Sequence, residues 1–413
     1  MPPSHHPRRA TGSRKSPLDL AGCTWLTARE SAASDERGTV TLPSPSPGRP
    51  LRAGVVGIGW AGQQHMAAYA AAADVELVAI AGKEEAIRAE LAATYGVSRT
   101  YADWEEMIAH GDLDVVSVAV PTFLHAPITI AALGTGAHVL CEKPIARTGA
   151  EGQAMVDAAR AAGRILEITF NHRRRGDIEA IRAAVEDGTI GRPYHARAIW
   201  LRRAGIPALG SWFTNAEMSG GGPLVDLGVH VLDWTLHLMG EPRVTAVSAV
   251  THSELGPRGL GGSGAVKHGT GSAYEVEDLA TALLRLEGGG SIVLETSWAS
   301  HRSTPDQFGI TLYGTDGGAD LSVVDYAPSG ELTIYTGDGE MSLDTPVVAP
   351  PGRGHAAVVE TFLSHVADPS SWPTHDGSIG LSRARIVDAC YASAAAGREV
   401  ALGPELEIIG GRP

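Results

Sequence analysis

Residues 51–62 read Leu-Arg-Ala-Gly-Val-Val-Gly-Ile-Gly-Trp-Ala-Gly, a short apolar run followed by glycines in the pattern G-x-G-x-x-G. The run predicts a buried strand over Leu51 to Val56, and a helix is expected to begin at Trp60. In a dinucleotide-binding turn the first glycine makes the tight bend, the second lets a pyrophosphate approach, and the third lets the helix pack on the strand. Free N–H groups at the helix start then face the phosphates. The sequence therefore predicts a dinucleotide site at Gly57, Ile58, Gly59, Trp60 and Gly62.

The end of the second expected strand bears on which dinucleotide is bound. Glu76 to Ala81 predicts this strand, and Gly82 and Lys83 follow it. Sites for NAD usually carry a carboxylate here, which binds the ribose hydroxyl. No carboxylate stands at this tip to repel a 2′-phosphate, and the cation of Lys83 would attract one. The prediction is therefore NADP in preference to NAD, with a solvated Lys83 paired to Glu84 or Glu85 as the alternative.

Further along the chain, short apolar runs alternate with alanine-rich helical stretches as far as Asn171. Continuous apolar strands between helices are typical of a parallel sheet that is covered on both faces. Beyond this point, long alternating strands with glycine turns predict a mainly antiparallel sheet. We therefore predict an α/β protein with a disordered extension over residues 1–50, a Rossmann domain over 51–171, and an α+β domain for substrate binding and oligomerisation over 172–413.

Composition narrows the class of partner. A net charge of −14 argues against nucleic acid and anionic membranes. No run of about 18 apolar residues predicts a membrane span, and charged residues after Arg8-Arg9 interrupt what would be the apolar part of an export signal. The cysteines, Cys23, Cys141 and Cys390, are far apart and odd in number, which predicts a reducing compartment. A cytoplasmic protein that binds small molecules is expected.

Two further motifs resemble the Gfo/Idh/MocA oxidoreductase family. The first is Pro121-Thr122-x-x-His125 followed by Gly136 to Pro144, which contains Glu142-Lys143-Pro144. The second is the run of glycines at 220–222 followed by Asp226, Gly228 and His230. The resemblance covers nearly everything after residue 50. It implies a Rossmann domain followed by an open antiparallel sheet, whose exposed face would form a homo-oligomer, a dimer or a tetramer.

The resemblance also implies roles for individual residues. It places Lys143 beside the nicotinamide and the substrate hydroxyl, and it assigns Asp226 and His230 to the catalytic group. The residues that it places at the cofactor are Pro121, Thr122, His125, Glu142 and Lys143. Many members carry Trp-Arg shortly before the glycine run, where this chain has Trp212-Phe213. The pocket is therefore expected to lack that guanidinium, and no member's substrate can be carried over.

The residue types fit removal of hydride from an alcohol. Asp226 and His230 are four residues apart on an expected helix over Pro223 to Met239, so they share a face. A histidine with a pKa near 6.5 suits a general base. Lys143 lies just beyond a strand end, where ligands of α/β sheets bind, and its cation would stabilise an alkoxide. The hypothesis is that His230 is the general base and Lys143 the electrostatic anchor, although these two roles could be exchanged. Asp226 would orient these groups or form a hydrogen bond with the substrate.

Three more residues are candidates for substrate binding: Arg173, Trp212 and His301. Arg173 belongs to the basic cluster at 173–175, for which a solvated helix entry is the alternative. Asp233 and His237 extend the polar face of the helix that carries His230. No further ligand motif accompanies them, so no metal site is predicted.

Together these features predict a dehydrogenase that transfers a hydride between NAD(P) and a secondary hydroxyl of a sugar, cyclitol or glycoside. One alternative is an enzyme on the same scaffold that retains its cofactor and oxidises a glycoside hydroxyl transiently, so that a bond is eliminated or hydrolysed. Net release of reduced cofactor distinguishes these two. Another alternative is a non-catalytic NAD(P)-binding sensor, against which Lys143 and His230 both argue, because a sensor needs neither.

Overall fold

The computed structural model describes residues 49–110, 112–263, 274–337, 341–406 and 408–409. The disordered extension predicted over residues 1–50 falls almost wholly outside this range, and so does the second half of the glycine-rich stretch at 253–273. Among the described residues, no helix is both long enough and apolar enough to cross a membrane.

The first sheet has the expected parallel arrangement. Its strands are β1 (Leu51–Val56), β2 (Val75–Ala81), β3 (Arg99–Tyr101), β4 (Val115–Val118), β5 (His138–Glu142) and β6 (Leu166–Thr169). All neighbours pair in parallel in the order β3-β2-β1-β4-β5-β6, which is the order of dinucleotide-binding Rossmann sheets. Its helices are α1 (Trp60–Ala71), α2 (Glu85–Tyr95), α3 (Trp104–His110), α4 (His125–Gly134) and α5 (Gly149–Ala162).

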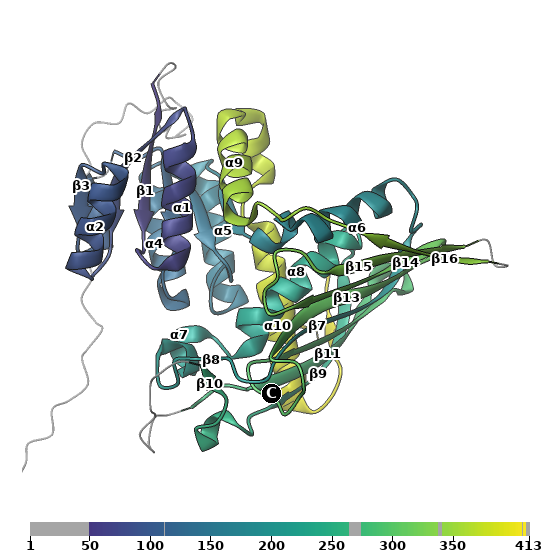
Figure 1. The fold of residues 1–413 in the computed structure, drawn as a ribbon. Helices are drawn as coiled ribbons and strands as arrows, with labels where there is room; N and C mark the ends of the chain where they lie inside the picture. The colour runs from purple at the N-terminus through teal and green to yellow at the C-terminus, as the bar shows by residue number, and fades with distance from the viewer. Residues whose placement is uncertain (1–48, 111, 264–273, 338–340, 407, 410–413) are drawn as a thin grey trace, which may run out of the picture. The chain divides into compact units, whose positions relative to one another are not determined.

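A helix from the far end of the chain completes this sheet. Helix α9 (Gly354–Ala367) packs against α1, and the two lie side by side in Figure 1. Val359 and Phe362 of α9 are buried in the same apolar cluster as Met66 and Tyr69 of α1. The predicted boundary at residue 171 therefore places α9 and the sheet that it covers in different domains. The apolar pattern of a helix shows that it packs on something, but not on which distant segment.

The second sheet is mainly antiparallel and follows the order β16-β15-β14-β13-β7-β12-β11-β9-β17-β18 among the described residues. The strands are β7 (Pro193–Arg202), β9 (Val244–His252), β11 (Leu279–Leu286), β12 (Ser291–Ser297), β13 (Asp306–Gly314), β14 (Gly317–Val324), β15 (Glu331–Gly337), β16 (Ser342–Val347), β17 (Val400–Leu402) and β18 (Ile408–Ile409). One pair, β7 with β12, is parallel. A separate two-stranded ladder joins β8 (Ile206–Pro207) to β10 (Gly262–Ser263).

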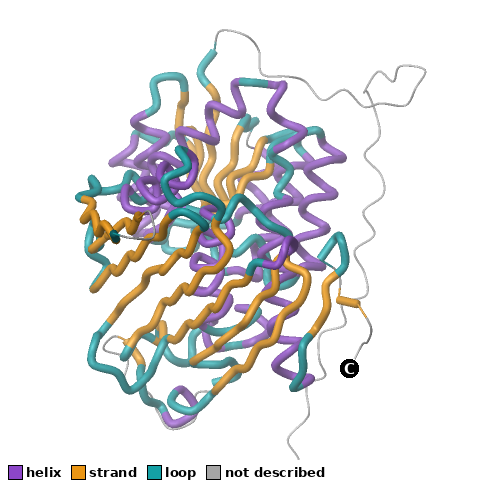
Figure 2. The backbone as a smooth tube through the Cα atoms, turned by 90° about the vertical axis from the view of Figure 1, so that its right-hand side faces the viewer, coloured by secondary structure: helices purple, strands orange, loops and turns teal. Residues whose placement is uncertain are grey.

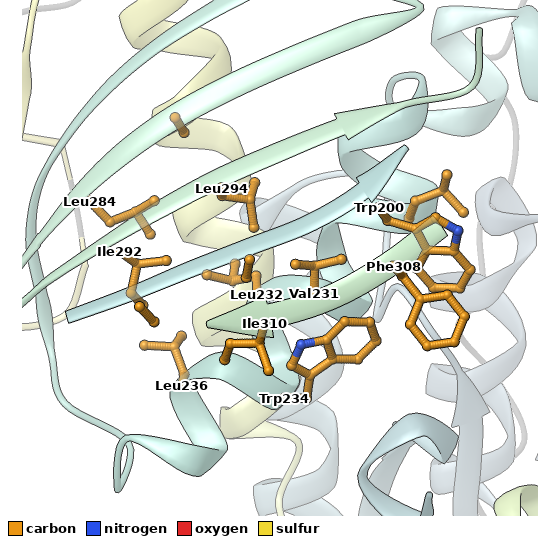
Figure 3. Packing of buried hydrophobic residues seen from close by; sticks show 14 of the residues in the cluster. Trp200, Val231, Leu232, Trp234, Leu236, Leu284, Ile292, Leu294, Phe308 and Ile310 are labelled. Atoms are coloured by element: carbon orange, nitrogen blue, oxygen red, sulfur yellow. The ribbon is translucent and has the colours of Figure 1, made fainter. Parts of the chain in front are cut away.

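One face of the second sheet carries the largest apolar core. Helices α6 (Gly176–Glu186), α8 (Val229–Leu238) and α10 (Ser378–Ala396) cover this face. Alternate residues of each strand point into it, as Figure 3 shows for Trp200, Phe308 and Ile310 against Val231 and Trp234 of α8. In Figure 2 the strands lie across the front of the view with helices behind them. Among the residues that the structure describes, the helices thus pack on one face of the sheet, as its alternating pattern predicts.

Two details differ from expectation and matter for the site. The helix expected over Pro223 to Met239 opens with a π-helical segment at Leu224–Gly228 before α8 begins. The segment between β7 and this π-helical segment is not wholly loop, since it contains β8 and a short helix, α7 (Ala216–Ser219). π-Helical turns within helices are rare and frequently lie at functional sites.

Candidate active site

A cavity of about 540 Å³ lies where the ends of β4 and β5 face the π-helical segment and the second sheet. From the nucleotide side it is lined by Trp60, Ala61, Ala119, Val120, Thr122, Glu142 and Lys143. From the other side its lining includes His172, Arg202, Trp212, Asp226, His230 and Trp298. The carboxyl ends of strands around the β1–β4 switch are where open α/β sheets bind ligands, so this is the candidate active site.

The glycine turn beside the cavity has the backbone that the motif demands. Gly57 has φ of +105°, and a Cβ there would lie 1.9 Å from the carbonyl oxygen of Ala119. A Cβ on Gly62 would lie 1.9 Å from the carbonyl oxygen of Gly57, so the helix start could not pack on the turn. A Cβ on Gly59, by contrast, would meet no described atom within 4 Å. The first and third glycines therefore serve the fold, and the second leaves open the space that a pyrophosphate would approach.

Lys143 is held by Asp226. The lysine follows β5, and its Nζ lies 3.0 Å from Oδ1 and 3.0 Å from the main-chain oxygen of Asp226 on the π-helical segment. The other carboxylate oxygen accepts a hydrogen bond of 3.0 Å from Nε1 of Trp298. Burial opposes ionisation of Asp226, but the charges of Lys143 and Arg202 and the two hydrogen bonds outweigh it and lower the pKa of the carboxyl group. Asp226 is thus an ionised group that fixes the ammonium.

His230 lies one turn further along and is neutral. Burial, and then the positive charge of Lys143, hold the pKa of His230 well below its usual value. Its ring centroid lies 4.5 Å from that of His172, whose pKa burial also lowers. Within the described chain, Nδ1 of His230 is buried without a hydrogen-bond partner. A neutral imidazole beside an ammonium can accept a proton from a hydroxyl that the ammonium binds.

The guanidinium of Arg202, which the sequence analysis did not identify, lines the cavity. Arg202 at the end of β7 points its Nε at Oδ2 of Asp306, 2.8 Å away, and also hydrogen-bonds the hydroxyl of Tyr326. Its guanidinium lies 5.5 Å from the ring centroid of Trp200. Phe213 still follows Trp212 where the motif has its arginine, and Arg202 was not identified because its place in the cavity depends on how distant segments pack.

Two histidines that the sequence analysis did not identify hold Glu142. His65 of α1 and His355 of α9 point their Nε2 atoms at Oε1 of Glu142, at 3.0 and 3.2 Å. Oε2 accepts a hydrogen bond of 3.2 Å from the backbone N–H of Lys143. Burial opposes ionisation of Glu142, but the two histidines outweigh it and lower the pKa of the carboxyl group well below its usual value. Nothing in the sequence near either histidine signals this, because the three residues come from distant segments.

Several predicted residues lie elsewhere. Arg173 is not among the described residues that line this cavity, because Asp233 accepts from its Nε at 2.7 Å and Glu241 also pairs with it. His301 is exposed outside the same lining. Asp233, considered above as a metal ligand, thus forms an ion pair.

Other predicted cofactor residues flank the cavity or support it. His125 is buried, and its ring nitrogens lie 2.8 Å from the carbonyl oxygen of Pro144 and 2.9 Å from that of Val120. His125 therefore does not face the cavity; it links the two segments that border it. Lys83 is solvent-exposed and ion-paired with Asp103. Trp212 does line the cavity, with its ring stacked on Phe213 at a centroid distance of 3.8 Å.

Comparison with known proteins agrees with this architecture. Residues 51–170 match a family model described as an oxidoreductase family with an NAD-binding Rossmann fold, and residues 178–320 match the GFO/IDH/MocA C-terminal domain. A D-glucoside 3-dehydrogenase of Escherichia coli is 34% identical, with 86% of this chain and 98% of that protein covered. A levoglucosan dehydrogenase of Pseudarthrobacter phenanthrenivorans is 30% identical over 82% of this chain and 87% of that protein.

Solved structures give the same result. A levoglucosan dehydrogenase in complex with NADH superposes with a TM-score of 0.74 at 28% identity, covering 86% of this chain and 99% of that chain. The two family models together span more than half of the sequence, and the parallel-then-antiparallel architecture described above is the one found in these structures. The chain therefore belongs to the Gfo/Idh/MocA family of oxidoreductases, with an NAD-binding Rossmann domain and relatives that are dehydrogenases and reductases of sugars and polyols.

Proposed function

We propose that this protein oxidises a secondary ring hydroxyl of a glycoside, with Lys143 and His230 handling the hydroxyl group. The observation that carries the proposal is the placement of a fixed ammonium and a neutral imidazole in one cavity beside the glycine turn. An ammonium has three N–H donors, and Asp226 accepts two of them. Within the described residues, one donor is thus left for a substrate oxygen.

Each residue has a distinct role in the proposed reaction. Lys143 donates to the hydroxyl oxygen and stabilises the negative charge that develops as the proton leaves. His230 accepts that proton in its neutral state. Asp226 and Trp298 hold the ammonium in place and are positioning residues. A dinucleotide whose pyrophosphate lay against the glycine turn would supply the hydride acceptor, its nicotinamide. The carbon loses a hydride and the oxygen a proton, which leaves a ketone.

A glycoside is favoured by the cavity and by the relatives. Rings of Trp60, Trp200, Trp212 and Tyr326 line it together with the guanidinium of Arg202, and aromatic faces with a few polar groups are typical of small-molecule pockets of this size. Two relatives that match most of this chain are named as D-glucoside 3-dehydrogenase and levoglucosan dehydrogenase. We therefore expect closed-ring glycosides to be better substrates than inositols or free aldoses.

The direct test is absorbance at 340 nm with NAD⁺ and NADP⁺ offered separately to a panel of alkyl glucosides, levoglucosan, inositols and aldoses. Net production of reduced cofactor with a glycoside is the expected result. Cleavage of a glycoside without net reduced cofactor would favour the cofactor-retaining alternative. Tight cofactor binding with no turnover of any compound would favour a sensor and contradict the proposal.

The preference for NADP is also a proposal, and it depends on Lys83. The ion pair of Lys83 with Asp103 is exposed, and solvent screening makes such a pair easy to open. Replacing Lys83 with Ala is expected to lower kcat/KM for NADP⁺ by about fivefold or more, a loss of one charge-assisted contact, while leaving kcat/KM for NAD⁺ unchanged. Equal effects on both cofactors would contradict this role.

The open face of the second sheet supports a further part of the proposal, a homo-oligomer. This face exposes Leu283, Tyr313 and Tyr335, on β11, β13 and β15. Apolar side chains at alternate positions of neighbouring strands are typical of a surface that another subunit covers. We expect a dimer or tetramer by light scattering, and a Tyr313→Glu variant is expected to dissociate it. A wild-type monomer at micromolar concentration would contradict this. A cytoplasmic location completes the proposal.

A further inference from the structure

We propose that Glu167, His365 and His375 form a binding site for a divalent transition metal, with Zn²⁺ as the expected ion. Glu167 lies on β6, His365 on α9, and His375 directly after the 3₁₀ turn at Pro369–Thr374. One ligand atom from each residue lies within 4.8 Å of the other two. The three side chains border a second cavity of about 510 Å³, which shares no described lining residue with the active-site cavity.

The spacing of the ligand atoms suits a single small cation. Nδ1 of His365 lies 2.5 Å from Oε1 of Glu167, and Nε2 of His375 lies 4.0 Å from the same oxygen. The two imidazole rings are in contact, with centroids 3.8 Å apart. Ligand bonds of about 2.1 Å around a tetrahedral zinc place the ligand atoms about 3.4 Å apart. The observed distances lie on either side of that value, so side-chain movements below about 1 Å would close the site.

Hydrogen bonds fix which nitrogen of His375 is available. Nδ1 lies 2.9 Å from the carbonyl oxygen of Ser371 and 3.1 Å from Oγ1 of Thr374. The Thr374 hydroxyl donates its own hydrogen to the Ser371 oxygen at 2.7 Å, so both neighbours of Nδ1 are acceptors. Nδ1 must therefore carry the proton, which leaves the lone pair of Nε2 directed at the carboxylate. Such an outer hydrogen bond is the usual way in which a metal-binding histidine is oriented.

The backbone holds these side chains in place without a metal. The N–H of Leu166 donates to the carbonyl oxygen of His375 at 2.8 Å, which ties the turn to β6 beside Glu167. Oγ of Ser371 donates to the carbonyl oxygen of His365 at 2.9 Å, and Nε1 of Trp372 donates to that of Val366 at 3.2 Å. The ligands are thus preorganised on three elements, which lowers the cost of ordering them on binding.

The ligand chemistry favours zinc over the harder cations. Two imidazoles and one carboxylate suit Zn²⁺, Co²⁺ or Ni²⁺, whereas Mg²⁺ and Ca²⁺ prefer oxygen ligands. The partly exposed side chains, with relative exposures of 28, 16 and 28% for His365, Glu167 and His375, leave room for water to complete the coordination from the cavity. Bound metal would replace the proton between His365 and Glu167 and cross-link β6, α9 and the turn.

The test is Zn²⁺ titration of the chelator-treated full-length protein by calorimetry, with Tm measured in parallel. Wild-type protein is expected to bind zinc at this site and to gain about 3 °C or more in Tm. Glu167→Gln and His375→Ala are each expected to weaken that binding by about 100-fold or more and to abolish the gain. His110→Ala, which removes an exposed histidine of α3, is the matched control and should bind as the wild type does.

Circular dichroism and cofactor affinity report whether each variant is folded, and Glu167→Gln keeps the volume of the site in case His375→Ala is unstable. Zinc affinity and Tm gain that persist in both folded variants would overturn the proposal and leave a plain hydrogen-bonded Glu–His cluster. Absence of tight zinc binding in the wild type would overturn it too. Neither result depends on dehydrogenase activity.

Discussion

At the scale of single residues, substitutions of two buried tryptophans distinguish the effect of a hydrogen bond on catalysis from the effect of packing. Nε1 of Trp298 donates to Asp226, whereas Nε1 of Trp234 has no partner in the described structure. Trp298→Phe removes one hydrogen bond to an ionised group while keeping most of the ring, so Asp226 and the ammonium of Lys143 are held less firmly. Because such bonds are worth about 1.5–3 kcal/mol, kcat is expected to fall by about tenfold or more.

Trp234→Phe is the matched control, and it should leave kcat within about twofold of the wild type because no bond is lost. Steady-state kinetics on a glycoside substrate give both numbers, and thermal unfolding shows whether packing changed. Equal losses of kcat in the two variants would mean that the ring, and not the hydrogen bond to Asp226, is what matters.

The residues that could be predicted from sequence are those within a local motif. Lys143, Asp226 and His230 stand in motifs, and the structure brings all three to one cavity. Arg202, His65 and His355 could not be found, because each reaches the site through packing between segments that are far apart in the chain. Arg173 was misplaced because its position in a basic run does not reveal that Asp233 and Glu241 draw its side chain away.

At the scale of elements, the glycine turn can be separated into structural and ligand-facing positions. A Cβ on Gly59 meets open space among the described atoms, so Gly59→Ala is expected to fold with an unchanged Tm. Its methyl group would occupy the approach of the pyrophosphate, and cofactor affinity is expected to fall by about tenfold or more, the loss of one charge-assisted contact. Fluorescence titration of NAD(P)H and a thermal melt measure the two effects.

Two other glycine substitutions serve as controls for Gly59→Ala. Gly57→Ala is expected to lower the Tm, because φ of +105° and the Ala119 carbonyl both exclude a side chain. Gly134→Ala near the end of α4 also meets open space, and it should affect neither binding nor folding adversely. Normal cofactor affinity in Gly59→Ala would show that the phosphates do not lie against this turn.

Helices and strands can be predicted where the apolar residues are strongly periodic. They are harder to predict where a strand forms only through its hydrogen bonds to a neighbouring strand. Strands β1 and β2 are rich in apolar residues, and the sequence predicts the bounds of both to within one residue. Strand β16 is exposed at all but its last residue, so it has no alternation to read and exists through its ladder with β15. The π-helical segment was also invisible, because apolar spacing at 224–238 fits a helix whether or not one turn is widened.

At the scale of the whole molecule, buried neutral histidines should make the fold sensitive to acid. Burial lowers the pKa of His138 to about 3 and of His237 to about 4, and it lowers those of His172 and His230 well below the usual value. Below about pH 6.5 the unfolded chain therefore binds protons that the folded chain does not, so stability falls as pH falls. Each such histidine contributes a slope of about 1.4 kcal/mol per pH unit.

Urea unfolding at pH 7.5, 6.5 and 5.5 tests this. His138 is a suitable reporter because its Nδ1 accepts from the N–H of Ile165 at 3.1 Å, a bond that protonation would break. His138→Gln can still accept that bond and does not titrate, so the variant should lose less stability between pH 7.5 and 5.5 than the wild type. A free energy of unfolding that is constant over this range would contradict the assignment of these histidines as neutral.

The architecture as a whole was the most predictable feature, because a parallel and then a mainly antiparallel sheet follow from how apolar residues alternate. The placement of α9 on the first sheet could not be predicted, because the apolar face of this helix could pack against the core of either sheet.

The most direct test of the proposed chemistry is the single-turnover rate of hydride transfer in Lys143→Met, with the enzyme preloaded with oxidised cofactor and mixed with an excess of a glycoside substrate. Lys143→Met/Asp226→Asn serves as a companion, because removing the lysine alone leaves the partly buried carboxylate of Asp226 without its cation. Cofactor affinity close to that of the wild type, together with hydride transfer slowed by about 10³-fold, is the predicted result. Transfer within a few-fold of the wild-type rate in either folded variant would contradict a role for this ammonium at the reacting hydroxyl.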